Sequence, residues 1–175
     1  MDRRANTSIS PPTSRKVQYL TLYNLVSAAL WAVILGRVVL FLPLIGPEKV
    51  YGGVGLLVKW TQTGALLEVV HSLFGIVRAP VSTTAIQVAS RFLLVWGIVD
   101  QFPQETSRSL AYSTMLLAWS FTEVVRYGYF VGVLRGGVPN FLPWLRYNTF
   151  YVLYPLGISS PMHFLYLVAV LDCGD

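Results

Sequence analysis

The sequence predicts an all-α protein, a bundle of about five membrane-spanning helices. Of its 175 residues, 54% are hydrophobic and only 12% are Asp, Glu, Lys or Arg, about half the charged share of a soluble domain. The mean hydropathy is +0.57, and apolar stretches of span length alternate with clusters of Pro and Gly. This composition excludes a disordered chain. It also argues against a soluble domain, because so few charges cannot cover an ordinary globule.

We expect residues 1–18 to form a disordered basic tail, 19–171 the transmembrane bundle, and 172–175 a short C-terminal tail. A span needs about 20 residues to cross the hydrocarbon layer. The candidate spans are Tyr19–Leu42, Gly52–Val77, Ala85–Phe102, Leu110–Leu134 and Trp144–Leu171. The residues that break helices and separate these spans are Pro43, Gly46, Pro47, Pro80, Pro103, Gly136, Gly137, Pro139 and Pro143.

The positions of the charges predict that the N-terminus lies in the cytosol. With that orientation the cytosolic segments hold Arg3, Arg4, Arg15, Lys16, Arg78, Arg135 and Arg146. The opposite segments hold only Lys49 and Arg108, beside Glu48 and Glu105. This is the asymmetry of the positive-inside rule. It explains the net charge of +5 without a nucleic-acid partner, so we expect none.

One cysteine and two histidines leave no disulfide framework and no zinc motif, so we expect no metal. His71 to Arg78 reads H-S-L-F-G-I-V-R, which resembles the phosphate-binding loop of tyrosine phosphatases with Ser72 in place of the nucleophilic cysteine. A serine without a positioned base is a poor nucleophile, so this pattern argues against phosphatase chemistry.

Several polar residues lie inside the predicted spans, where each charge costs at least about 2.5–3.5 kcal/mol on insertion scales. Helical spacing of three or four places them in pairs on shared faces. The pairs are Glu68 with His71, Gln87 with Arg91, and Glu123 with Arg126. They either fix the bundle through interhelical ion pairs or line a polar cavity near a substrate. Because of the cost of charge in lipid, we expect Glu68, Arg91, Glu123 and Arg126 to form one polar core together with Tyr154.

The fifth span carries a group of aromatic residues after Arg146. An aromatic belt at the membrane interface explains Trp144 and Tyr147. It explains Tyr154 less well, because eight helical residues past Arg146 is about 12 Å deeper. A tyrosine at that depth needs a hydrogen-bond partner or a function. The neighbouring Pro155 interrupts the helical hydrogen bonds, which is tolerated where backbone lines a cavity.

Five stretches of the chain, in this order, resemble the membrane 3-hydroxyacyl-CoA dehydratases of very-long-chain fatty-acid elongation, also called protein-tyrosine-phosphatase-like proteins. They are Y-L-T-L-Y-N (Tyr19–Asn24), L-E-V-V-H-S-L-F-G-I-V-R (Leu67–Arg78), Q-V-A-S-R (Gln87–Arg91), E-V-V-R-Y (Glu123–Tyr127) and L-R-Y-N-T-F-Y-V-L-Y-P-L-G (Leu145–Gly157). Together they cover about Tyr19 to Ser160.

The resemblance implies a six-helix protein of the endoplasmic reticulum that converts (3R)-3-hydroxyacyl-CoA to trans-2-enoyl-CoA without a cofactor. It also implies membrane lipid and other elongation enzymes as partners. The family's catalytic tyrosine, in the motif Y-P-x-G, corresponds to Tyr154. Its catalytic glutamate, seven residues later, corresponds to Pro161. The arginines Arg78, Arg135 and Arg146 either bind the phosphates of CoA or only set the orientation.

The chain departs from the family pattern at Pro161, and we expect the family's sixth span to be missing after Ser160. We therefore expect either an altered or truncated gene product or a diverged, inactive member. Removing water needs both an acid and a base, and each typically contributes 10²–10⁴-fold. Tyrosine is a natural acid and a poor base, so Glu68, Glu123 or His163 would have to replace the glutamate. The two functional hypotheses are a lyase and a non-enzymatic membrane protein that binds elongation partners.

Overall fold

The computed structural model describes residues 14–108 and 110–148, without the side chains of 105, 107 and 108. This part of the chain is helical and contains no strand, which agrees with the predicted all-α class. The helices are α1 (Arg15–Ile45), α2 (Pro47–Gly64), α3 (Leu66–Leu73), α4 (Val81–Phe92), the π-helical segment η1 (Leu93–Val99), α5 (Pro103–Arg108) and α6 (Leu110–Arg135). Residues 141–148 are also helical.

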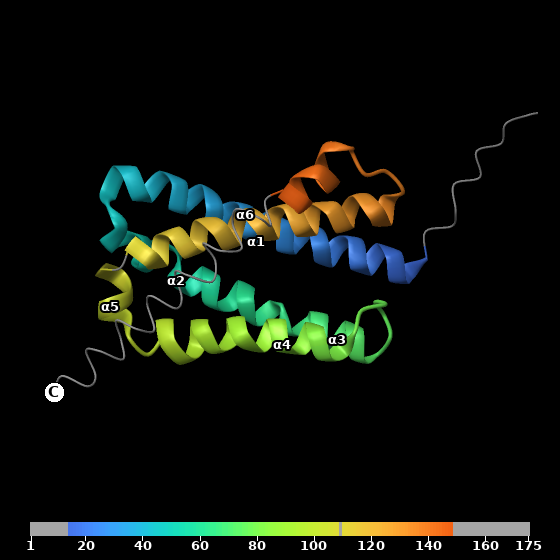
Figure 1. Cartoon of the computed structure of the whole chain (residues 1–175), viewed down its shortest axis with the longest axis horizontal. Coiled ribbons are helices and arrows are strands. Elements are labelled where there is room, and N and C mark those ends of the chain that lie inside the picture. Colours follow the sequence, from blue (N-terminus) through green and yellow to red (C-terminus); the bar gives the residue numbers. More distant parts are fainter. Residues whose placement is uncertain (1–13, 109, 149–175) are drawn as a thin grey trace, which may run out of the picture.

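The long helices run back and forth along the long axis of the molecule, which is horizontal in Figure 1. α2 and α3 return along α1, α4 and η1 run back, and α6 returns again. The start of α1, the connection after α3 and the end of α6 therefore lie at one end of the bundle. α6 packs most extensively on α1, and α4 packs on α3. This topology brings Arg78 and Arg135 to the same end as the start of α1.

α1 is longer than the predicted first span. It begins after Ser14, whose side chain accepts a hydrogen bond from the backbone N–H of Val17 at 3.3 Å, an N-cap that satisfies one free donor of the first turn. It ends at Gly46, whose φ of 82° lies in the region that glycine tolerates. Pro43 was expected to break the helix, but it lies inside α1, so the break falls at Gly46.

The second predicted span, Gly52–Val77, is not one helix. It is divided at Ala65, whose N–H bonds the carbonyl of Gln62 at 3.1 Å, a tightened turn between α2 and α3. α3 then ends early, because Gly75 takes a φ of 64°. The N–H of Ile76 reaches the carbonyl of His71 at 2.8 Å, and the N–H of Gly75 reaches Ser72 at 3.1 Å, the bonding of a Schellman motif.

The third predicted span, Ala85–Phe102, combines α4 with η1. In η1 the N–H of Asp100 bonds the carbonyl of Val95 at 3.0 Å, five residues back, which is the π-helical pattern. Arg91 and Asp100 are nine positions apart, so an ideal α-helix would point them to opposite sides. The wider turns of η1 reduce that angle, and both residues form ion pairs with neighbouring helices.

The fourth predicted segment is one helix, α6, which ends one residue past the predicted limit. Of the fifth span, only its beginning is described, in the helical residues 141–148. Tyr154, Pro161 and His163 lie outside the described residues, as does the tail before residue 14.

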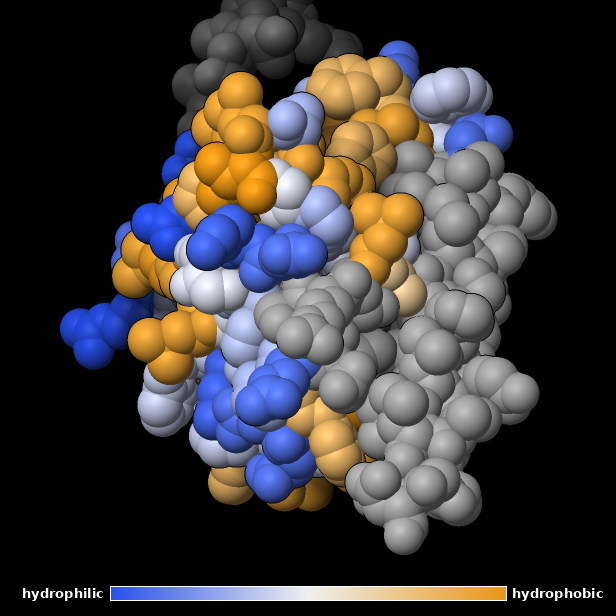
Figure 2. Space-filling view, turned by 90° about the vertical axis from the view of Figure 1, so that its left-hand side faces the viewer, coloured by the Kyte–Doolittle hydropathy of each residue, from blue (hydrophilic) through white to orange (hydrophobic). Residues whose placement is uncertain are grey.

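The core lies between α1, α2 and α6 and is built from stripes of side chains three or four residues apart. Its best buried members are Trp31, Ile34, Val38, Val50, Val54, Val58 and Leu116. Large apolar side chains on the outer faces are exposed, such as Leu22, Leu56 and Ile86 at 62%, 71% and 70%. Figure 2, viewed toward α5, shows hydrophobic residues reaching the surface among hydrophilic ones. So much apolar surface indicates contact with lipid or another protein.

Within the described residues, two helices are long and apolar enough to cross a membrane, Arg15–Ile45 and the composite Val81–Val99. Only 17% and 11% of their most apolar windows are buried inside the molecule, whereas the core helix of a soluble protein would be mostly buried. The structure therefore favours a membrane protein. It does not confirm the predicted count of five spans.

The end of α3 supplies the first test. Replacing Gly75 by Ala should destabilise the protein by about 1–2 kcal/mol, because a Cβ is strained in the left-handed region. The matched control is Gly52→Ala inside α2, where an added Cβ meets nothing within 4 Å. The control should be neutral or stabilising by up to about 1 kcal/mol. Thermal unfolding in detergent measures both, and equal midpoints for the two variants would contradict this account of the helix end.

Candidate functional site

The four predicted charges meet in one cluster where α3, α4 and α6 come together. Arg126 on α6 forms a two-pronged pair with Glu68 on α3, with N–O distances of 2.9 and 2.8 Å. The same guanidinium binds Glu123, one turn earlier on α6, at 2.9 and 2.6 Å. Arg91 on α4 donates to the other oxygen of Glu123. The prediction that these four charges share one core is confirmed, and its Tyr154 part lies outside the described residues.

The cluster leaves neither carboxylate free. The hydroxyl of Tyr127 donates to Oε1 of Glu68, so each of the four carboxylate oxygens accepts at least one hydrogen bond. Two arginines balance two glutamates, so the cluster is neutral. The Glu123 side chain is only 3% exposed, and a charge buried to that degree is stable only when it is paired and fully hydrogen-bonded.

His71 extends the polar cluster toward α1. Its Nε2 lies 2.8 Å from the hydroxyl of Tyr19. Its ring also meets the Tyr23 ring edge-to-face at a centroid distance of 5.0 Å. Tyr23 in turn contacts the Tyr127 ring at 6.2 Å. Glu68 and His71 therefore act from one face of α3, as predicted, but they have separate partners.

Gln87 was predicted to act with Arg91, and the structure does not bring it into the cluster. Its residue is exposed, whereas Arg91 is half-buried. Positions four apart share a helix face, but they also differ by one turn along the axis, about 5.4 Å. That turn takes Gln87 past the cluster.

The three tyrosines of the site were not singled out from the sequence. Tyr19 and Tyr23 lie four apart near the start of α1, and Tyr127 follows Arg126 directly. The spacing of four residues places Tyr19 and Tyr23 on one face of a helix, and this spacing was the one sequence feature that pointed to a joint role for them. Nothing in the sequence told which helix that face would contact.

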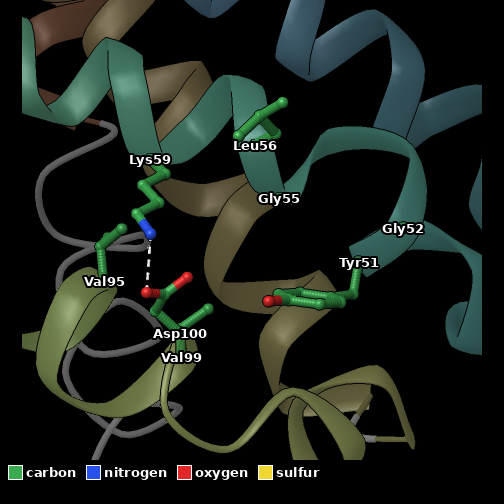
Figure 3. Close-up of a pocket in the computed structure, with 8 residues that line it drawn as sticks. All are labelled: Tyr51, Gly52, Gly55, Leu56, Lys59, Val95, Val99 and Asp100. Atoms are coloured by element: carbon green, nitrogen blue, oxygen red, sulfur yellow. Dashed lines mark hydrogen bonds and ion pairs between the residues drawn. The ribbon is translucent and has the colours of Figure 1, made fainter.

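A second ion pair joins α2 to the end of η1. Lys59 Nζ lies 2.6 Å from Oδ2 of Asp100 and 3.9 Å from the centre of the Trp96 ring. Figure 3 shows the pair at one wall of a cavity of about 240 Å³. Tyr51 lines the same cavity. Lys59 and Asp100 are 41 positions apart in the sequence, and the π-helical segment η1 ends directly before Asp100.

The three basic residues predicted to meet phosphate have different surroundings. Arg78 and Arg135 are exposed and lie at the end of the bundle where α1 begins. The guanidinium of Arg146 lies over the rings of Tyr129 and Phe130, at 4.7 and 5.3 Å from their centres. Cation–π contacts of this kind orient the side chain.

Ser72 has a structural role in the loop that resembles a phosphatase motif. It is 6% exposed, and its Oγ donates to the carbonyl of Ala79 at 2.8 Å. The bond closes the connection between α3 and α4. A serine held in this way is not a free nucleophile. Among the described residues, no group of three or more His, Cys, Asp or Glu is placed to hold a metal.

The described residues form a helical bundle with exposed apolar faces, two helices long and apolar enough to cross a membrane, and a neutral ion cluster that joins three helices. The family model for protein tyrosine phosphatase-like protein, PTPLA, matches residues 62–171. The chain belongs to this family.

Three relatives show how similar the chain is to characterised members. It is 46% identical over 146 residues to the probable very-long-chain (3R)-3-hydroxyacyl-CoA dehydratase of Schizosaccharomyces pombe, covering 83% of this chain and 70% of that protein. It is 42% identical to the Arabidopsis thaliana dehydratase PASTICCINO 2, covering 85% and 67%. It is 36% identical to human very-long-chain (3R)-3-hydroxyacyl-CoA dehydratase 2, covering 85% and 58%. No solved structure matches the chain.

Removal of the central arginine tests the cluster. Arg126→Met keeps much of the side-chain length but leaves Glu68 and Glu123 without their shared partner. We expect a loss of about 3–5 kcal/mol of stability, the cost of breaking a buried pair from one side. The control is Arg37→Met, which removes an exposed arginine that donates to the Gly53 carbonyl at 3.1 Å and should cost about 1 kcal/mol or less. Denaturation in detergent gives both values. Similar small losses for both variants would show that hydration, and not Arg126, stabilises the two carboxylates.

Proposed function

We propose that this chain is a hydro-lyase that converts (3R)-3-hydroxyacyl-CoA to trans-2-enoyl-CoA in very-long-chain fatty-acid elongation. The observation that carries the proposal is the 36–46% identity to proteins named as such dehydratases. The buried ion cluster supports it, because the residues that build it fall within the stretches that resemble the family.

The reaction removes a proton from C2 of the acyl chain and a hydroxyl from C3. Tyr154 is the acid that protonates the leaving hydroxyl. The base that takes the C2 proton is a glutamate in the family pattern, and Pro161 occupies its position. Glu68 and Glu123 are poor replacements, because Arg126 and Arg91 neutralise their charge and so make both carboxylates weaker bases.

The cluster acts as the frame for the site. It joins α3, α4 and α6 and fixes how these helices sit relative to one another. A base must lie within about 3 Å of the proton it removes, so a stable frame contributes to the reaction without touching the substrate. We assign no chemical step of the reaction to His71 or Gln87.

We propose the endoplasmic reticulum membrane as the location, with the N-terminus in the cytosol. Arg78 and Arg135, exposed at the end where α1 begins, would then face the cytosol and bind the phosphates of CoA, and Arg146, held over Tyr129 and Phe130 of α6, would be a third candidate contact. Membrane lipid and other elongation enzymes are the expected partners.

A second candidate function follows from Pro161. A chain that keeps the fold without the second catalytic group would act by binding elongation partners. Comparing the activity of the unchanged chain with that of Pro161→Glu, which restores the catalytic pair, separates the enzyme from the partner-binding protein.

Dehydratase activity is the direct test of the proposal. We expect the chain as it stands to show greatly reduced turnover, and Pro161→Glu to raise it by about 10²–10⁴-fold, the usual contribution of a general acid or base. Tyr154→Phe in the Pro161→Glu background should abolish the gain. Formation of the enoyl thioester by purified protein in detergent is the measurement. No gain in the Pro161→Glu variant would favour the partner-binding function, while full activity of the unchanged chain would mean that another group serves as the base.

The orientation has its own test. An acceptor site for N-glycosylation placed within residues 1–15 should remain unmodified after membrane insertion, because the basic tail is held on the cytosolic side. A glycosylation-acceptor loop inserted at Gly46, between α1 and α2, is the control and should be modified. A modified tail would reverse the orientation and remove the arginines from the CoA side.

A further inference from the structure

An apolar groove runs along the outer side of the bundle between α3 and α4. It has a volume of about 660 Å³. Its residues are all apolar: Leu66, Val69, Val70, Ala85, Val88, Ala89, Phe92 and Leu93. Figure 1 shows the two helices side by side at the edge of the bundle.

Small side chains create the groove. Ala85 and Ala89 are four apart on α4 and so share one face. Val88, 6% exposed, forms the deepest part. Val70 and Leu93 stand at the rims, 40% and 65% exposed. A larger residue at either alanine position would fill the space.

The ion cluster joins each wall of the groove to α6. Glu68 lies on α3 among the groove residues and turns to Arg126, and Arg91 lies on α4 and turns to Glu123. Both walls are therefore fastened to α6 from behind. A groove fastened in this way is already formed before any ligand arrives, as binding sites usually are.

The groove has different chemistry at its end. Residues 74–80 connect the two walls and read F-G-I-V-R-A-P, with Arg78 and no acidic residue. Arg78 is exposed, and Arg135 lies at the same end of the bundle. This arrangement is complementary to an amphiphile with a long hydrocarbon tail and a phosphate-bearing head.

We propose that this groove holds the hydrocarbon chain of a long-chain acyl-CoA, with Arg78 binding the phosphates of the CoA head. The inference rests on the proposed function and adds to it the place of the acyl chain. Ala85 and Ala89 then determine which chains fit, and they are specificity-determining residues rather than catalytic ones. A bilayer phospholipid would share the tail chemistry, so the experiment distinguishes the two.

Photolabelling of the full chain in phosphatidylcholine nanodiscs tests the groove. The probe is a long-chain acyl-CoA with a diazirine in the middle of its chain. We expect label on peptides from α3 and α4, displaced by excess unlabelled long-chain acyl-CoA. Ala89→Phe should reduce this label several-fold, and its control Ala32→Phe, at an exposed alanine on α1, should not. Ala85→Leu, a milder change, covers the case in which Ala89→Phe does not fold.

Three outcomes would count against the inference in different ways. Label on α3 and α4 that is displaced by phospholipid and not by acyl-CoA would mean that bilayer lipid occupies the groove. Label elsewhere, displaced by acyl-CoA and unchanged in both groove variants, would overturn the groove and leave the proposed function intact. Labelling that acyl-CoA never displaces at any position would remove the proposed function together with the groove. Arg78→Ala should weaken the labelling by long-chain and short-chain probes alike.

Discussion

Arg126 joins α3 and α6 through a single guanidinium, and Glu123 extends the connection to Arg91 on α4. These helices come from distant parts of the chain, and each brings charge into an environment where an unpaired charge is costly. The planar guanidinium can bind two carboxylates at once because its donors point in fixed directions. The attachment of α3 and α4 to α6, and with it the position of both groove walls, follows from this neutral cluster.

The fold class and the shared polar core could be predicted from the sequence, because both depend on free-energy costs that act on any chain. Too little charge for a soluble surface indicates a membrane. Four charges in apolar segments must pair. The identity of the pairs was less accessible: Glu68 could have met Arg91, and its choice of Arg126 depends on the rotation of α3 after the turn at Ala65. The contact of His71 with Tyr19 depends on the same rotation of α3. The two residues are 52 positions apart, so their spacing in the sequence gives no sign of the contact.

The helix limits show where pattern alone does not suffice. Apolar periodicity continues from α3 to Val77, but Gly75 makes a left-handed turn more favourable than another helical residue. Periodicity likewise gives no sign of η1, because a π-helical segment retains apolar side chains and changes only the hydrogen-bond partner. The pairing of Lys59 with Asp100 therefore could not be derived from spacing. The role of Pro161 rests on the resemblance alone, whereas the spacing from Arg146 already drew attention to Tyr154. The charge asymmetry likewise grouped Arg78, Arg135 and Arg146 on one side.

The neutral cluster also bears on how the protein is made. α3 and α4 leave the ribosome before α6, and in the part of the chain that the structure describes the ion pairs of Glu68 and Arg91 are with residues of α6. Until α6 is synthesised, each of these helices carries a charge whose exposure to lipid costs at least about 2.5–3.5 kcal/mol. The early helices therefore remain poorly suited to the hydrocarbon layer on their own, and they have to stay near the insertion machinery or near one another until α6 arrives. Membrane integration of this chain is in that sense a collective event, completed by the helix that is made after them.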